Sequence, residues 1–199
     1  MGNRAVSFWD ERPLPTEFPW LPIHDVIWQA AGQKPIDILD LAAGPGRFSV
    51  PLLQQGCRVT AVELGPKLAR HLGSLRGSGG GTMVVVEQDV RACHFPPASF
   101  DLIICSQILH FLSLTEAQEL LAQCRDWLRP GGLLLLRWFA PGGELSFRFD
   151  RFVVSAGDML SRMDGGRVLM ESVQELPTAE KRADGSLKTH QVVEMIIAF

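Results

Sequence analysis

The chain has little that points to metal, disulfide or nucleic-acid chemistry. Its four cysteines, Cys57, Cys93, Cys105 and Cys124, are scattered and form no Cys-x-x-Cys pair, so we expect reduced thiols in a cytoplasmic protein. The formal net charge is −3, which gives no basic surface for nucleic acid. No apolar run approaches the ~18 residues that span a bilayer, and the first ten residues lack the apolar segment of a signal peptide. We therefore expect no metal, no nucleic-acid partner and no membrane segment.

Short apolar segments alternate with amphipathic ones along most of the chain. The 199 residues are 46% hydrophobic, which suits one domain with a well-buried core. The pattern predicts strands at 36–41, 58–62, 82–87, 100–105 and 133–139, and helices at 23–30, 47–55, 66–75 and from Ser113 to a stop at Pro130-Gly-Gly132. Continuously apolar strands are typical of a parallel sheet covered by helices on both faces.

The last third of the chain has a different pattern. It predicts a short helix near 155–163, a strand near 167–176, an Asp184-Gly185 turn and a strand near 190–199. The expected fold is α/β: a Rossmann-like, doubly wound, seven-stranded, mostly parallel sheet with a C-terminal antiparallel hairpin. We expect a single domain over 1–199, with a proline- and aromatic-rich arm at 1–22, a core at 36–140, and a lid and terminal hairpin at 141–199.

The most informative stretch runs from Ile38 to Arg47 and is followed by the segment that ends at Glu63. An apolar strand leads into a turn with Gly44 and Gly46, where the lack of a Cβ lets the backbone approach a ligand closely. A carboxylate at the tip of the next strand can accept hydrogen bonds from both hydroxyls of a ribose. These residues predict a site for an adenosine-containing ligand.

Three classes of adenosine-binding protein share this arrangement. A P-loop requires G-x-x-x-x-G-K-[S/T], which is absent. The dinucleotide pattern G-x-G-x-x-G fits Gly44 and Gly46, but Ser49 stands in the third place. Glu63 is shared with the third class and does not separate the two, so a dinucleotide-dependent reductase stays an alternative at this point.

The third class is the class I S-adenosylmethionine-dependent methyltransferases, which the chain resembles in five motifs over roughly 36–140. The motifs, in family order, are Asp40-Leu-Ala-Ala-Gly-Pro-Gly46, Glu63, Glu87-Gln-Asp-Val90, Phe100–Ser106 with Leu109-His-Phe-Leu112, and Leu128-Arg-Pro-Gly-Gly132. One departure is Ala42, where many members have glycine; alanine is small enough to be acceptable.

This resemblance implies S-adenosylmethionine as cofactor, bound by the 36–140 core. It implies that Asp40 binds the methionine ammonium, that Ala42, Gly44 and Gly46 lie beside the methionine and ribose, and that Glu63 binds the ribose hydroxyls. It also implies that Leu64 packs against the adenine, that Asp89 and the Val90 amide bind the adenine edge, and that Cys105 and Ser106 form the floor beside the methionine. For Asp89, a turn-initiating aspartate is the competing explanation.

A narrower resemblance joins the chain to small-molecule methyltransferases of the tellurite-resistance and thiopurine type. It lies in Phe8-Trp-Asp-Glu-Arg12 and in the tail with its Asp-Gly turn, although Pro13 interrupts the pattern directly after Arg12. It implies that the arm closes over the cofactor site and that the acceptor is a small molecule, such as a thiol or another soft nucleophile. The sequence predicts neither the acceptor itself nor the oligomeric state.

No residue identifies itself as a general base, and a strongly acidic acceptor needs none. His110 is a weak catalytic candidate because the pKa of histidine lies near neutrality, but we expect it to be a helix-entry residue, and His24 likewise to have no catalytic duty. Trp9, Phe18 and Trp20 are either an aromatic wall beside the sulfonium or packing for the arm. A catalytically silent S-adenosylmethionine-binding partner or sensor domain is the second functional hypothesis.

Overall fold

The computed structural model describes residues 13–77, 79–141, 154–163, 165–182 and 184–199, without the side chains of 178–181. The Phe8–Arg12 motif and the first part of the expected lid therefore lie outside the described residues. Within those ranges, no helix is long and apolar enough to cross a membrane.

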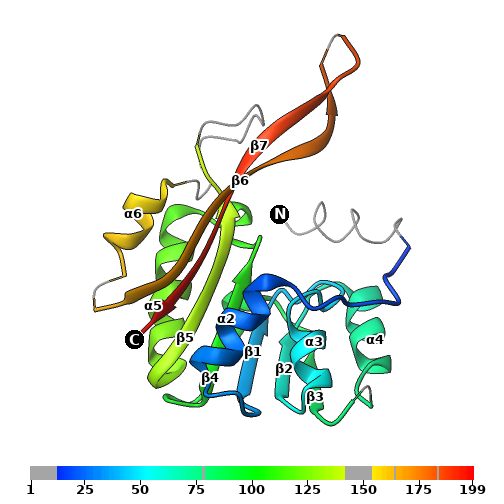
Figure 1. The fold of residues 1–199 in the computed structure, drawn as a ribbon, viewed down its shortest axis with the longest axis vertical. Helices are drawn as coiled ribbons and strands as arrows, with labels where there is room; N and C mark the ends of the chain where they lie inside the picture. The colour runs from blue at the N-terminus through cyan, green and yellow to red at the C-terminus, as the bar shows by residue number, and fades with distance from the viewer. Residues whose placement is uncertain (1–12, 78, 142–153, 164, 183) are drawn as a thin grey trace.

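A seven-stranded sheet runs through the molecule in the order β3-β2-β1-β4-β5-β7-β6 (Figure 1). The strands are β1 (Asp37–Leu41), β2 (Arg58–Val62), β3 (Thr82–Val86), β4 (Phe100–Ser106), β5 (Leu128–Phe139), β6 (Arg167–Lys181) and β7 (Leu187–Ala198). Strands β1 to β5 are parallel to one another, whereas β7 is antiparallel to both β5 and β6. The predicted fold class is confirmed, including the C-terminal antiparallel hairpin.

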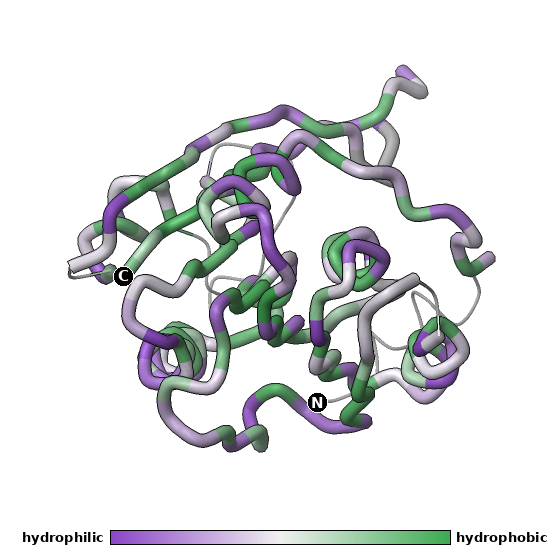
Figure 2. The backbone as a smooth tube through the Cα atoms, turned by 60° about the horizontal axis from the view of Figure 1, so that its bottom comes forward, coloured by the Kyte–Doolittle hydropathy of each residue, from purple (hydrophilic) through white to green (hydrophobic). Residues whose placement is uncertain are grey.

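Helices cover both faces of the sheet and bury two separate apolar cores. The helices are α2 (Pro22–Ala30), α3 (Ser49–Gln54), α4 (Pro66–Ser74), α5 (Leu114–Trp127) and α6 (Ala156–Leu160), with 3-10 turns η1 (Val90–Ala92) and η2 (Leu109–Phe111). One core joins the sheet to α5 and α6, and the other joins it to α2 and α3. Figure 2 shows hydrophilic and hydrophobic residues alternating around the helices, as expected for helices with one face on a core.

Predicted boundaries were wrong at the end of α5 and in the hairpin, because strand pairing extends further than the local pattern suggests. Helix α5 ends at Trp127, and Pro130-Gly-Gly132 lies inside β5 instead of ending the helix. Leu128 already pairs with Phe100, and a residue that precedes proline, as Arg129 does, is pushed toward extended backbone. The hairpin strands are also longer than predicted, and they project as a two-stranded ribbon beyond the rest of the sheet (Figure 1).

Arg129 gives the Leu128–Gly132 motif a structural role at the amino ends of the strands. Its guanidinium donates to Asp37 Oδ2 at 2.9 Å and lies 2.8 Å from Asp101 Oδ2. Asp37 also accepts from Arg58, so four strands are joined by one charge network. These side chains are partly exposed, which limits the stabilisation to about 1 kcal/mol per pair. The network lies at the strand ends opposite to those that hold the predicted cofactor residues.

Candidate cofactor site

The loop after β1 makes a tight turn through left-handed backbone. Ala42, Gly44 and Gly46 have φ angles of +54°, +57° and +94°, a region that favours glycine because a Cβ crowds the backbone there. Ala43 N–H donates to the Val62 carbonyl at 3.0 Å, and this bond docks the loop on β2. The backbone at Ala42 is therefore one that glycine adopts more readily than alanine.

The two glycines of the loop are required for different reasons. A Cβ on Gly46 would lie 2.4 Å from Val50 Cγ2, so at this position glycine lets the loop pack on α3. A Cβ on Gly44 would meet no atom within 4 Å, because that side of the loop faces open space. The sequence argument that glycine keeps a Cβ away from a ligand therefore applies to Gly44, whereas internal packing explains Gly46.

Glu63 follows β2 directly and ties two loops together. Its carboxylate accepts from Gly44 N–H and from Gly65 N–H, both at 2.8 Å. Burial raises the pKa of this carboxyl, while the backbone N–H donors act in the opposite direction. Each oxygen keeps a further lone pair, so the side chain can accept bonds from a diol without giving up the loop contacts. The sequence predicted the ribose-binding role but did not reveal that Glu63 also positions the Gly44 turn.

Asp40 lies inside β1 and is only 3% exposed. Burial raises the pKa of its carboxyl to about 7, and the nearby charge of Glu63 adds to this rise. The buried Ser49 hydroxyl on α3 is close enough to lower the pKa but meets hydrogen-bond geometry with no described residue. The serine that breaks the dinucleotide pattern thus lies beside the carboxyl expected to meet the methionine ammonium.

Asp89 has the turn-initiating role that was the competing explanation for it. It caps η1 by accepting from Arg91 N–H and Arg91 Nε, both at 3.0 Å. The Arg91 side chain is the main cause that lowers the pKa of Asp89. The contact to the adenine stays a prediction. Val90 is buried, whereas Leu64 is 44% exposed and is an apolar side chain available to a flat ligand.

Cys105 and Ser106, the residues predicted to form the floor beside the methionine, lie in different surroundings. Cys105 is fully buried in the core that faces α5, and burial, followed by the charge of Asp40, raises the pKa of its thiol to about 12. Ser106, the last residue of β4, is half-buried and pairs in register with Arg137 of β5. His110 lies in η2 with its ring centroid 4.1 Å from that of Phe111 and 4.4 Å from that of Phe139.

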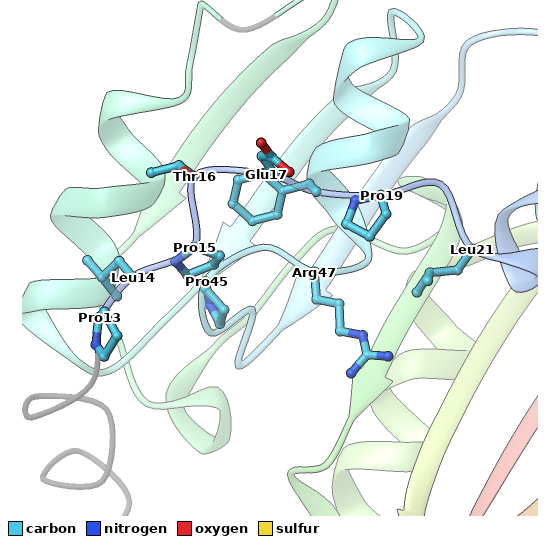
Figure 3. A pocket seen from close by; sticks show the side chains of 10 residues that line it. Pro13, Leu14, Pro15, Thr16, Glu17, Pro19, Leu21, Pro45 and Arg47 are labelled. Carbon is cyan, nitrogen blue, oxygen red and sulfur yellow. The ribbon is translucent and has the colours of Figure 1, made fainter.

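The described part of the arm crosses the upper ends of α4 and α3 in Figure 1. Residues 13–19 and Leu21 line, together with Pro45 and Arg47 of the Gly44 loop, a cavity of about 790 Å³ (Figure 3). This volume is within the range of small-molecule sites. Part of the arm therefore lies against the loop where the cofactor is expected.

His24 anchors the arm to the loop and to α3. Its Nδ1 accepts from Leu21 N–H at 2.8 Å, and its Nε2 lies 3.0 Å from the Phe48 carbonyl, to which it can donate. Burial lowers the pKa of this imidazole, which matches the neutral tautomer that these two bonds require. Trp20 packs on α2, with its ring 5.0 Å from that of His24, and donates to Asp25.

The sheet order, the left-handed turn after β1 and the acid after β2 define the class of the domain. It has the class I methyltransferase architecture. The residues present fit S-adenosylmethionine, because Gly44 borders open space, the Glu63 carboxylate lies beside Gly44, and Asp40 is a buried acid on the neighbouring strand. The family model described as "Methyltransferase domain" matches residues 38–132. Residues 38–132 of the chain are therefore similar to a methyltransferase domain.

Solved structures and curated proteins agree with this class. TehB from Haemophilus influenzae superposes with a TM-score of 0.74 at 16% identity, covering 97% of this chain and 66% of that one. A Burkholderia thailandensis 1,6-didemethyltoxoflavin-N1-methyltransferase, solved with its acceptor and S-adenosylhomocysteine, gives 0.66 at 25% identity, covering 98% and 84%. The tRNA N(3)-methylcytidine methyltransferase Mettl2 of Drosophila melanogaster is 28% identical over 177 residues, covering 85% of this chain and 54% of the relative. The chain spans about half the length of the first curated relatives it matches.

Proposed function

We propose that this protein transfers a methyl group from S-adenosylmethionine to a small-molecule acceptor. The observation that best supports the proposal is the Glu63 carboxylate, which is held 2.8 Å from the Gly44 amide beside open space. A diol bound to Glu63 would place the rest of the cofactor along the Gly44 loop and above Asp40. When bound, the cofactor supplies a methyl group on a sulfonium, which leaves readily once an acceptor is aligned with it.

In this proposal, residues of the chain bind and orient the cofactor and cover the site. Glu63 accepts from the ribose hydroxyls, and Asp40, in its ionised form, accepts from the ammonium. Leu64 packs on the adenine, and Asp89 with the Val90 amide contacts its edge. The arm excludes water from the site, which strengthens the charge contacts inside it.

A small acceptor is favoured over a macromolecular one. The arm encloses its cavity from one side, and the Burkholderia neighbour is named for a small heterocyclic acceptor. The named substrate of Mettl2 makes an RNA acceptor the second candidate. The net charge of −3 weighs against an RNA acceptor, because phosphate contacts need basic side chains.

We also propose a cytoplasmic location, since all four cysteines are free and buried.

Calorimetric titration with S-adenosylhomocysteine tests the cofactor assignment. We expect micromolar binding, and at least a tenfold loss in Glu63→Ala, because a buried charged acceptor for two hydroxyls is removed. Glu87→Ala, an exposed acid that follows the neighbouring strand, is the matched control and should bind normally. No binding to the wild-type protein, or equal binding in both variants, contradicts the assignment.

Transfer of labelled methyl groups tests catalysis. Wild-type protein would be incubated with labelled S-adenosylmethionine and, separately, with a panel of thiols and phenols and with bulk tRNA. Label in a small molecule supports the proposal, whereas label only in tRNA supports the second candidate. Tight cofactor binding without transfer to either supports the catalytically silent domain. Transfer to thiols should require no general base, because the thiolate is itself the nucleophile.

A further inference from the structure

A buried arginine interrupts the apolar face of β5 directly beside the proposed cofactor site. Arg137 is 5% exposed, and the residues two and four positions before it on the same face, Leu135 and Leu133, belong to the apolar core. Strand register places Ser106 of β4, Arg137 of β5 and Glu194 of β7 in one row across the sheet. This row is two residues beyond the row that contains Asp40, so it lies at the carboxyl ends of the parallel strands.

The protein satisfies this guanidinium incompletely. Within the described ranges, its ion-pair partner is Glu194, whose Oε2 lies 3.4 Å from the Arg137 Nε, a distance longer than an ordinary N–H···O hydrogen bond. A guanidinium carries five N–H donors in a planar fork, and buried polar groups of this kind are normally hydrogen-bonded. The two terminal nitrogens of Arg137 therefore have donors left for an oxyanion.

The charge around Arg137 also favours an anion. Arg47, on the Gly44 loop, acts electrostatically on both Arg137 and Glu194. Figure 3 shows the Arg47 side chain extending away from Pro45, toward the strands β4 and β5. Two guanidiniums thus act on one carboxylate, that of Glu194.

An aromatic wall borders the same row. Phe139 follows Arg137 by two positions on β5, and its ring centroid is 4.5 Å from that of His190 and 4.4 Å from that of His110. His190 is 8% exposed, and its Nδ1 is buried with no hydrogen-bond partner among the described residues. Flat rings beside a guanidinium fork suit a flat ligand with a carboxylate or a similar planar oxyanion.

We propose that Arg137 is the specificity-determining residue of the acceptor site and that it selects a small planar acid, such as an aromatic carboxylate. This inference rests on the proposed methyl transfer, because the acceptor must lie next to Ser106 and the methionine end of the cofactor. Glu194 is the internal counter-ion of Arg137 and occupies one of its donors in the absence of the acid.

Benzoate and its neutral isostere benzamide are the probes, titrated calorimetrically into wild-type protein saturated with S-adenosylhomocysteine. We expect benzoate to bind at least tenfold more tightly than benzamide. Arg137→Gln should remove this difference, and Arg137→Lys should retain part of it. Arg125→Gln, on the exposed side of α5, is the matched control and should keep the full preference.

Glu194→Gln separates recognition from a structural role. It removes the competing carboxylate, so benzoate should bind several-fold more tightly than to wild-type protein, the opposite of Arg137→Gln. If the pair only held the sheet together, both variants would weaken the protein and neither would tighten benzoate. Equal binding of the two probes to wild-type protein, or an unchanged preference in Arg137→Gln, overturns the inference. Binding of S-adenosylhomocysteine, measured first on each variant, shows separately whether the proposed cofactor site is intact.

Discussion

Replacing Asp40 by asparagine should change how the stability of the cofactor-free protein depends on pH. Burial raises the pKa of Asp40 from 3.8 to about 7, so the folded state holds a proton that the unfolded state releases above pH 4. The stabilisation from this proton is fully present below pH 4 and is lost as the pH rises through 7. A rise of about three units corresponds to about 4 kcal/mol.

Asparagine resembles the neutral carboxyl in shape and carries no charge at any pH. Asp40→Asn should therefore match the wild-type protein in unfolding free energy below pH 4 and exceed it at pH 8.5 by up to about 4 kcal/mol, of which about 3 kcal/mol develops between pH 5 and 8.5. Urea denaturation followed by circular dichroism at several pH values measures the difference. Carboxyls whose pKa is lowered, such as Asp37 beside Arg58, contribute with the opposite sign, but they are present in both proteins and cancel. Parallel stability curves from pH 5 to 8.5 would refute the argument.

The same protonation should be linked to cofactor binding. An ammonium beside Asp40 favours the ionised carboxyl, so binding of S-adenosylhomocysteine at pH 6 should release close to one proton. Titrations in buffers with different ionisation enthalpies count the protons released. Asp40→Asn, which has no proton to release, is the control. A wild-type count near zero would mean that Asp40 does not meet the ammonium.

Three further substitutions test the loop geometry. Glu63→Gln should lower the free energy of unfolding by about 2 kcal/mol, because an amide nitrogen replaces one acceptor of two buried N–H groups; urea midpoints equal to those of Glu87→Gln would contradict this. Gly46→Ala should cost about 2–4 kcal/mol, since the added Cβ meets Val50 at 2.4 Å in left-handed backbone, and an unchanged melting temperature would disprove the packing argument. Ala42→Gly should stabilise the protein by about 0.5–1 kcal/mol by removing backbone strain at φ +54°; a lower melting temperature would show that this alanine is not strained.

The strands and the cofactor loop were predictable because their signals are local. The run 58–62 contains the β-branched residues Val59, Thr60 and Val62, which favour a strand, and the observed β2 has the predicted bounds. The capping box at Ser113 and Glu116 fixed the start of α5, since both reciprocal bonds form within one turn. Boundaries failed where pairing between distant segments decides them, as at Leu128, which joins β5 through its pairing with Phe100.

By itself, the sequence determined the class of fold and the identity of the acids at the ends of β1 and β2, because hydrophobic periodicity and short motifs are written in neighbouring residues. Only the tertiary structure decided what those groups do to one another. Burial sets the pKa of Asp40, and Glu63 holds the Gly44 turn through a contact across two loops. Register alone brings Ser106, Arg137 and Glu194 into one row. Solvent exclusion and register depend on segments far apart in the chain, which local patterns do not encode.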